Sequence, residues 1–169
     1  MKYCPECGAP LTERELPPDG MIPYCSACGE FRFPVFSTAV SMIIRDPDEK
    51  RILLIKQYGR PHNILAAGYV NKGESAEDAV FRETREETGL ELSGICFNKS
   101  SYFPPTDTLM LNFYCTAASC SLECLNRSEV DEAGWYSFAE AKKAIKPGSL
   151  AESFLLSFID LPEKKHFAV

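Results

Sequence analysis

The stretch GYVNKGESAEDAVFRETREETGL, residues 68–90, decides the fold expected of this chain. Ser75 stands where a helix cap stands, with Asp78 three residues later as a capping-box partner. Ala, Val, Phe, Arg and Glu follow, and Gly89 supplies the left-handed residue that ends many helices. We therefore expect one helix at about residues 76–88.

Three glutamates of this helix, Glu83, Glu86 and Glu87, are spaced so that their carboxylates lie on one face. Carboxylates packed together repel one another and raise their own pKa values unless a cation neutralises them. All-oxygen ligands suit hard ions, so the pattern predicts Mg²⁺ or Mn²⁺ rather than Zn²⁺. Arg82 cannot bind a cation, but it can hold Glu74 or Glu86 through two hydrogen bonds and so orient a carboxylate.

A bare E-x-x-E-E pattern is more often a solvated acidic helix face, on which Glu and Arg side chains form surface pairs. In this chain several further residues stand in register with the cluster: Gly68, Glu74, Arg82, Gly89 and Leu90. That longer constellation favours the metal site over the solvated face.

At these positions the chain resembles the Nudix hydrolase box, G-x5-E-x7-R-E-U-x-E-E-x-G-U with U apolar. The one departure is Thr84 at the first U position, where threonine keeps a methyl group and similar bulk. The resemblance implies an α/β fold, the Nudix α/β/α sandwich with a mixed sheet. It also implies a pyrophosphohydrolase that uses metal ions to hydrolyse a nucleoside diphosphate linked to another group.

Four N-terminal cysteines form two C-x-x-C pairs, Cys4 with Cys7 and Cys25 with Cys28. A two-residue gap lets both thiolates of a pair reach one tetrahedral ion, and a glycine after each pair permits a tight turn. We therefore expect a zinc ribbon over residues 1–34, in which structural Zn²⁺ replaces a core too small to form alone. A redox dithiol and a nucleic-acid-binding ribbon are the less favoured interpretations.

Residues 35–169 are expected to form the Nudix domain. Runs of β-branched and apolar residues predict strands at 38–45, 51–57, 64–67, 94–102, 108–116 and 135–136. A helix is expected at about 138–145, and a capping box of Ser149 with Glu152 predicts another at about 150–160. Small residues at Ala66, Ala67 and Gly68 would let the backbone approach a ligand closely. Their carbonyl groups are then available to a metal ion.

An apolar share of 45% and a charged share of 25% are ordinary for a soluble globular protein. The net charge of −6 argues against a broad nucleic-acid or anionic-membrane surface, although a local basic patch remains compatible with it. The first residues lack the apolar core of a secretory signal, and no apolar run approaches the roughly 20 residues that span a bilayer. We expect a cytoplasmic protein with no membrane partner.

With ribbon and box together, the chain is similar to the zinc-ribbon NADH pyrophosphatase branch of the Nudix family, without the domain that precedes the ribbon in that branch. The resemblance implies a set of metal ligands: the Ala67 carbonyl, Glu83, Glu87, Glu129 and the Ala151 carbonyl, with Glu86 beside them. It also implies that Phe33, five residues beyond the last zinc cysteine, contacts the nucleotide, and that the chain forms a homodimer.

That branch carries a Ser-Gln-Pro-Trp-Pro-Phe-Pro-x-Ser motif after the box, which marks specificity for reduced dinucleotides. Here Ser100 and Pro104 agree with the motif, Phe103 replaces the tryptophan, and the rest is lost. We therefore expect the pyrophosphatase chemistry but leave the substrate open. Phe33, Tyr102 and Phe103 are candidates for stacking on a base or nicotinamide, and each can equally be a core aromatic.

The sequence thus predicts metal-dependent hydrolysis of a small-molecule nucleotide, such as NAD(H) or ADP-ribose. The general base, the group that takes the proton from water, can be Glu83, Glu86 or Glu129. A non-catalytic nucleotide sensor, whose zinc ribbon binds nucleic acid or a protein, is the alternative. The intact acidic cluster disfavours it, and the acidic net charge disfavours an RNA 5′-end pyrophosphatase of the same chemistry.

Overall fold

The computed structural model describes residues 1–160, and the chain divides into two compact units, Met1–Phe36 and a second unit that begins at Ser37. The expected end of the second domain, at residue 169, lies outside the described residues. None of the helices in residues 1–160 has the length and apolar content needed to cross a lipid bilayer.

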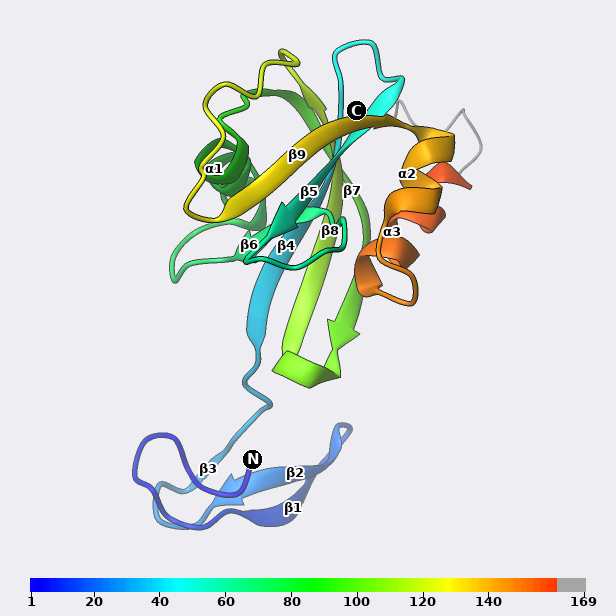
Figure 1. Cartoon of the computed structure of the whole chain (residues 1–169). Helices are drawn as coiled ribbons and strands as arrows, with labels where there is room; N and C mark the ends of the chain where they lie inside the picture. Colours follow the sequence, from blue (N-terminus) through cyan, green and yellow to red (C-terminus); the bar gives the residue numbers. More distant parts are fainter. Residues whose placement is uncertain (161–169) are drawn as a thin grey trace. The chain divides into compact units, whose positions relative to one another are not determined.

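The first unit is a small antiparallel sheet with the strand order β1-β2-β3 (Figure 1). Its strands are β1 (Thr12–Leu16), β2 (Gly20–Cys25) and β3 (Glu30–Phe31). Within residues 1–36, all of which the structure describes, Cys4 and Cys25 are the buried side chains. This unit therefore has almost no apolar core of its own.

The second unit is built on a six-stranded sheet with the order β7-β8-β4-β5-β9, in which β6 also pairs with β4. The strands are β4 (Ser37–Arg45), β5 (Arg51–Gln57), β6 (Ala66–Tyr69), β7 (Leu92–Phe103), β8 (Thr108–Ala117) and β9 (Val130–Ser137). Strands β4 and β8 run parallel, whereas the other pairs are antiparallel. The mixed sheet expected from the sequence is confirmed.

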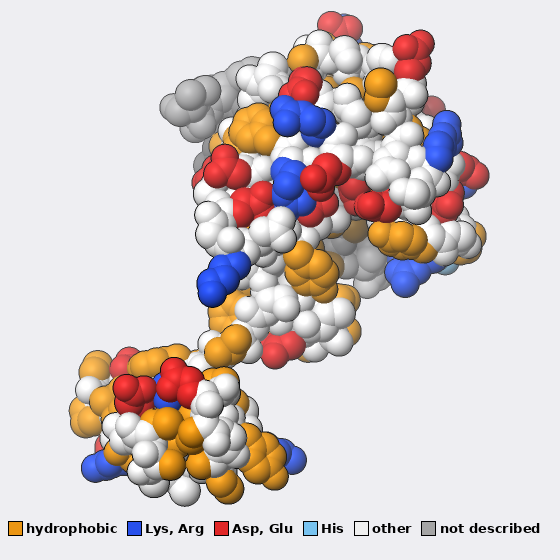
Figure 2. Space-filling model, turned by 90° about the vertical axis from the view of Figure 1, so that its left-hand side faces the viewer, with side chains coloured by type: hydrophobic (Ala, Val, Ile, Leu, Met, Phe, Trp, Pro, Cys, Tyr) orange, Lys and Arg blue, Asp and Glu red, His pale blue; other side chains and the backbone are white. Residues whose placement is uncertain are grey.

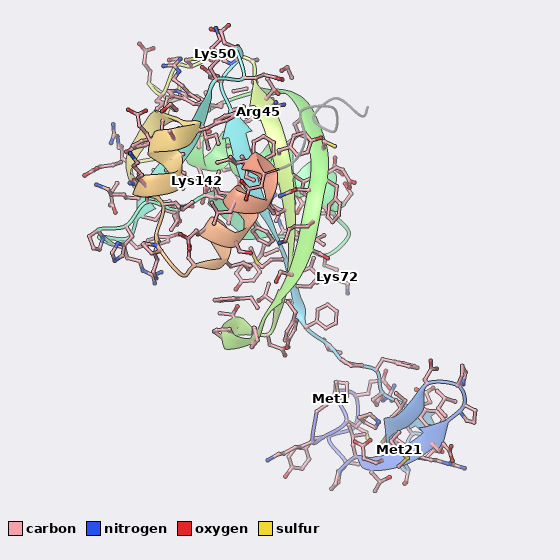
Figure 3. The ribbon with its side chains drawn as sticks, turned by 90° about the vertical axis from the view of Figure 1, so that its right-hand side faces the viewer. Met1, Met21, Arg45, Lys50, Lys72 and Lys142 are labelled. Atoms are coloured by element: carbon pink, nitrogen blue, oxygen red, sulfur yellow. The ribbon has the colours of Figure 1, made fainter. Side chains whose placement is uncertain are left out.

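Helices cover both faces of this sheet. They are α1 (Ala76–Thr88), α2 (Phe138–Ala144) and α3 (Leu150–Ile159), and a short 3₁₀ helix, η1 (Pro104–Thr106), joins β7 to β8. Figure 1 shows α1 on one side of the sheet and α2 with α3 on the other. Figure 3 shows α2 and α3 together, with Lys142 labelled on α2. The α/β/α sandwich is likewise confirmed.

Each face of the sheet has its own hydrophobic core. The core on the α1 side contains the side chains of Val40, Met42, Leu53, Ile55, Ala79, Val80, Leu90 and Phe113, among others. The core on the side of α2 and α3 contains those of Ile43, Ile52, Leu54, Tyr114, Ile145, Phe154, Leu155 and Phe158. Neighbouring residues of β4 and β5 alternate between the two cores, because successive side chains of a strand point to opposite faces.

Helix α1 begins and ends where the sequence predicts. The Ser75 hydroxyl accepts the Asp78 backbone N–H at 3.0 Å, and Gly89 has φ +71°, the left-handed conformation that closes the helix. The Asp78 carboxylate accepts the Ser75 hydroxyl at 2.7 Å. A complete capping box occurs instead at α2, between Ser137 and Glu140, where the sequence had not suggested one.

Strands β6 and β9 differ most in extent from the sequence prediction. Strand β6 covers Ala66–Tyr69 rather than 64–67, because its pairing with β4 runs from Met42 opposite Ala66 to Ala39 opposite Tyr69. Strand β9 starts at Val130, well before 135–136. After the buried Val130, the next residues of β9, Asp131 and Glu132, are acidic and exposed, because β9 is an edge strand with one side to solvent. The start of the strand therefore lacks the continuous apolar run of a buried strand.

Candidate functional site

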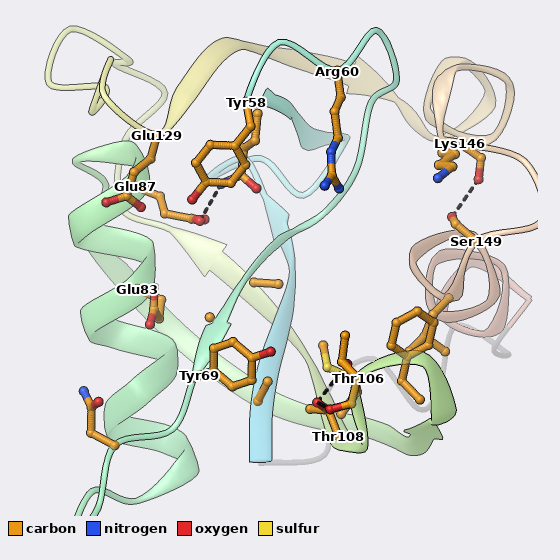
Figure 4. A pocket seen from close by; sticks show the side chains of 18 of the residues that line it. Tyr58, Arg60, Tyr69, Glu83, Glu87, Thr106, Thr108, Glu129, Lys146 and Ser149 are labelled. Atoms are coloured by element: carbon orange, nitrogen blue, oxygen red, sulfur yellow. Dashed lines mark hydrogen bonds between the residues drawn. The ribbon is translucent and has the colours of Figure 1, made fainter. Parts of the chain in front are cut away.

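A cavity of about 760 Å³ in the second unit gathers most of the acidic residues that the sequence singled out (Figure 4). Helix α1 contributes Glu83 and Glu87, and the turn before β9 contributes Glu129. Strand β6 supplies the backbone of Ala67 and Gly68. The lining is continued by residues of three further segments, namely the loop after β5, the turn between β7 and β8, and the chain that leads into α3: Tyr58, Arg60, Phe103, Thr106, Thr108, Lys146, Gly148, Ser149 and Leu150.

The Glu83 side chain lies directly on the backbone of Gly68. A Cβ atom added at Gly68 would lie 1.8 Å from Cδ of Glu83 and 2.1 Å from its Oε1. No side chain fits in that space, so glycine is required for α1 to bring its carboxylate against β6. This contact explains why the first glycine of the box stands where it does.

Arg82 organises the outer side of the acidic cluster. Its guanidinium donates to both carboxylate oxygens of Glu74, at 2.7 and 2.9 Å, and to the Glu83 carboxylate at 2.7 Å. It also reaches Glu86 at 3.0 Å, so the two partners considered from the sequence are both held. Hydrogen bonding from Arg82 lowers the pKa of Glu74 to about 2. Figure 2 views the molecule from the side on which α1 lies in Figure 1. On the second unit it shows acidic side chains interspersed with basic ones.

Glu87 is the buried acid of the cavity, with 3% of its surface exposed. Its Oε1 accepts a hydrogen bond of 2.6 Å from the Gln57 side-chain amide, whereas its buried Oε2 has no hydrogen-bond partner. Burial, together with the smaller effect of the nearby charges of Glu83 and Glu129, raises the pKa of Glu87 to about 7. Repulsion between carboxylates, the cause expected from the sequence, therefore acts but is smaller than the effect of burial.

Glu129 reaches the cluster because the turn that carries it is tied to the end of α1. The Asn126 backbone N–H donates to the Glu87 carbonyl at 3.0 Å, and the Glu129 N–H donates to the Asn126 carbonyl at 3.1 Å. Figure 4 shows Glu129 beside Glu87 at the carboxyl end of α1. Two acids far apart in the sequence thus face the same cavity.

The donor set of this cavity fits a hard divalent cation. Glu83, Glu87 and Glu129 offer only oxygen ligands, and a buried carboxylate oxygen without a partner carries a desolvation cost that a cation would offset. Among residues 1–160, the carboxylates do not form a group of three whose ligand atoms all lie within 4.8 Å. Binding an ion would therefore draw the acids closer together than their mutual repulsion allows without it.

The NUDIX domain family matches residues 35–154 of this chain. The chain belongs to the Nudix family. It is 31% identical over 153 residues to Nudix hydrolase 19, chloroplastic, of Arabidopsis thaliana, which aligns 85% of this chain with 34% of that protein. It is 28% identical over 160 residues to the NAD-capped RNA hydrolase NudC of Pseudomonas fluorescens, which aligns 95% of this chain with 55% of that protein. The chain thus spans less than two thirds of either relative.

Solved structures show the same fold. A Nudix hydrolase from Nitrosomonas europaea superposes with a TM-score of 0.69 at 21% identity, covering 98% of this chain and 93% of that one. The Nudix domain of Shewanella oneidensis NrtR, solved with ADP ribose, superposes with a TM-score of 0.62 at 15% identity, covering 81% of this chain and 92% of that one. At such identities the likeness concerns the fold alone.

Several residues predicted for the Nudix site lie outside the cavity lining. The Glu86 side chain is 55% exposed and pairs with Arg82. Tyr102 is half exposed, and its hydroxyl donates to the Asp107 carboxylate. Ala151 directly follows the lining residue Leu150, and Phe33 belongs to the first unit, where it is exposed. Their functional roles stay predictions.

The four cysteines of the first unit converge as a metal site requires. Their sulfur atoms all lie within 4.8 Å of one another, with 4.0 Å between Cys4 and Cys28 and 3.5 Å between Cys7 and Cys25. Sulfur atoms about 2.3 Å from a central tetrahedral Zn²⁺ would be about 3.8 Å apart. A hydrogen bond from the Cys7 backbone N–H lowers the pKa of Cys4 to about 6, which favours the thiolate that zinc needs. The cluster is compatible with the expected zinc ribbon.

Sequence reasoning missed the polar residues on the wall opposite α1, notably Arg60 and Lys146. Neither belongs to a motif, and they are far apart in the chain. Gln57 was also missed, although the sequence contains a signal for it, because it is an amide two residues beyond the apolar run ILLI of the same strand. A buried amide needs a polar partner, and here that partner is Glu87.

Proposed function

We propose that this Nudix chain hydrolyses the pyrophosphate bond of a nucleoside diphosphate linked to another group. The observation that carries the proposal is the buried, partnerless Oε2 of Glu87, a residue that lines the cavity together with Glu83 and Glu129. Such a site stabilises a bound cation and has no evident use without one. Mg²⁺ or Mn²⁺, when bound, would neutralise phosphate oxygens and activate water.

In this proposal Glu83, Glu87 and Glu129 hold the ions, with the Ala67 and Gly68 backbone beside them. Arg82 orients Glu83 through a hydrogen bond of 2.7 Å and keeps Glu74 charged. Glu129 and Glu83 line the cavity, so either can accept the proton of the attacking water, whereas Glu86 lies outside the lining. The Ala151 carbonyl completes the ligand set implied by the family resemblance.

A dinucleotide or a similar small nucleotide is the proposed substrate. The cavity volume of about 760 Å³ lies in the range usual for small-molecule sites. Phe103 lines the cavity and offers a ring on which a base can stack. The relatives named NAD-capped RNA hydrolase NudC support a substrate that contains an NAD-like diphosphate.

The test compares wild-type protein with Glu87→Gln, in Mg²⁺ or Mn²⁺, on NADH, ADP-ribose, diadenosine polyphosphates and nucleotide sugars. Removing a group that only orients a metal ligand typically lowers metal affinity or activity by about 10–100-fold. Removing a ligand itself should therefore lower kcat/KM by at least about 100-fold. Glu77→Gln, an exposed change on the same helix, should leave turnover intact. Undiminished turnover by Glu87→Gln, or binding of nucleotides without turnover by the wild type, would contradict the proposal.

A further inference from the structure

The cavity has a basic wall opposite its acidic one. In Figure 4 Glu83 and Glu87 project from α1, whereas Arg60 and Lys146 lie across the cavity from that helix. A second pocket of about 150 Å³ shares four lining residues with the main cavity. Its lining is Gln57, Tyr58, Arg60, His62, Ile64 and Lys146. It contains no carboxylate, in a protein whose net charge is −6.

The two cationic residues of this pocket, Arg60 and Lys146, lie on backbone segments that are hydrogen-bonded to each other. Asn63 and Ile145 form a parallel bridge, and the Lys146 backbone N–H donates to the Asn63 carbonyl at 2.9 Å. The Asn63 side-chain amide adds a bond of 3.2 Å to the Ala144 carbonyl. The loop after β5 and the loop before α3 therefore hold Arg60 and Lys146 at a set spacing.

A tight turn presents Arg60 toward the pocket. Tyr58 has φ +54° and Gly59 has φ +67°, so two successive residues adopt the left-handed conformation. The Gly59 N–H donates to the Asp131 carboxylate at 2.7 Å, and the Arg60 N–H donates to the Gln57 carbonyl at 3.1 Å. A non-glycine residue is held in this conformation only where surrounding bonds enforce it, and such positions concentrate at ligand sites.

Among the described residues, neither Arg60 nor Lys146 forms an ion pair, whereas ten such pairs occur elsewhere in residues 1–160. Two uncompensated cations beside a pocket without acids create a local positive potential that attracts anions. A guanidinium offers a fork of N–H groups that matches phosphate oxygens, and an ammonium adds a point charge. The chemistry of this wall suits phosphate.

We propose that Arg60 and Lys146 form a subsite for a phosphate group that the substrate carries in addition to the diphosphate that is cleaved. The inference rests on the proposed function, which assigns the cleaved diphosphate to the acidic wall and its cations. The basic wall binds the additional phosphate directly, without a metal ion. Substrates with this phosphate are therefore preferred over otherwise identical ones without it.

The experiment uses substrate pairs that differ by one phosphate group, with kcat and KM measured separately. NADPH against NADH places the group on the ribose, and diadenosine triphosphate against diadenosine diphosphate places it in the phosphate chain. We expect wild-type kcat/KM to be about tenfold higher for the phosphate-rich member of one pair, a size usual for hydrogen bonds to charged groups. The pair that shows the preference identifies where the additional phosphate lies.

Arg60→Gln, Lys146→Gln and the double variant should abolish this preference by raising KM for the phosphate-rich substrate, with kcat and the other substrate unchanged. Lys143→Gln, an exposed change on α2 that lines neither pocket, should keep the preference. No wild-type preference in either pair would overturn the proposal. A preference that survives in the double variant would also overturn it. So would an equal fall of kcat/KM for both members of a pair, or disappearance of the preference in Lys143→Gln.

Calorimetric titration of the same pairs in the presence of Mg²⁺ separates the subsite from the proposed function. If none of the substrates is hydrolysed, the proposed function fails. Tighter binding of the phosphate-rich member by the wild type, lost in the double variant, would still support the subsite. Equal binding of both members by the wild type would overturn it.

Discussion

The Glu87 carboxyl group is the residue whose surroundings matter most to the proposed chemistry. It is buried, accepts a hydrogen bond from the Gln57 amide, and lies near the charges of Glu83 and Glu129. In water its charge would be solvated, whereas here the protein solvates it only in part. The site therefore stores an unfavourable interaction that a divalent cation would relieve.

This environment predicts a pH dependence of stability without added Mg²⁺ or Mn²⁺. The pKa of Glu87 is raised from 4.5 to about 7 in the folded protein, so the protonated form favours folding. That contribution is complete below the ordinary pKa and is lost as pH rises through about 7. We expect the Tm of the wild type to fall between about pH 5 and about pH 8. Thermal unfolding across this range measures it.

In Glu87→Gln this fall should largely disappear, because glutamine does not titrate. Glu77→Gln, on the exposed face of α1, should keep it. The pKa of Glu74 is lowered to about 2, so Glu74 changes stability only at more acidic pH and does not mask the fall in Tm caused by Glu87. A fall of the same size in Glu87→Gln would show that another group is responsible.

Gly68 yields a second prediction at the residue scale. In Gly68→Ala the new methyl group would meet the Glu83 carboxylate, so that carboxylate must move. A displacement of about 1 Å in a site can cost about 100-fold in rate. We expect kcat/KM to fall by about that factor while circular dichroism shows a folded protein.

The matched control is Gly94→Ala in β7. A Cβ atom at Gly94 would meet no heavy atom within 4 Å, and its backbone is not left-handed. This change should leave activity intact. Equal activity of Gly68→Ala and Gly94→Ala would mean that Glu83 does not depend on its contact with Gly68.

Among the elements, α1 is the platform of the acidic wall, and its ends are set locally. Ser75 caps the first turn, and Gly89 closes the last with φ +71°. Because these signals lie within a few residues of the helix, its bounds were predicted correctly at both ends. By contrast β6 and β9 take their bounds from pairing with β4 and β5, and their predicted bounds were wrong.

Ser75→Ala tests the cap. Removal of a serine N-cap costs about 1 kcal/mol of unfolding free energy. Urea unfolding can be followed by the fluorescence of Trp135, the single tryptophan, which lies in β9 and so reports on the second unit. Ser153→Ala, at an exposed position of α3, should change stability by less than about 0.5 kcal/mol. Equal effects of the two changes would show that the Ser75 hydroxyl does not stabilise α1.

At the scale of the whole molecule, the two units differ in how they are stabilised. The second unit has a core on each face of its sheet, whereas the first buries only Cys4 and Cys25 within residues 1–36. A unit so poor in buried apolar side chains needs another source of folding free energy. The four converging thiolates can obtain it from a bound zinc ion.

We therefore expect about one zinc ion per chain, measured by elemental analysis, with the ion lost in Cys28→Ser and kept in Cys120→Ser. Removal of zinc should make residues 1–36 sensitive to proteolysis, while the Trp135 unfolding transition stays in place. Loss of that transition together with zinc would show that the second unit depends on the ribbon. Full protease resistance of zinc-free protein would show that the ribbon folds without metal.

The sequence by itself determined the features that depend on neighbours along the chain: the bounds of α1, the glutamates on its face and the two cysteine pairs. Helical periodicity, capping and chelate spacing are local, so a short window contains all their information. Only the tertiary structure decided that Gln57 donates to Glu87 and that Arg60 and Lys146 share a pocket. Burial and the meeting of distant segments depend on sheet register and loop packing, which no short window encodes.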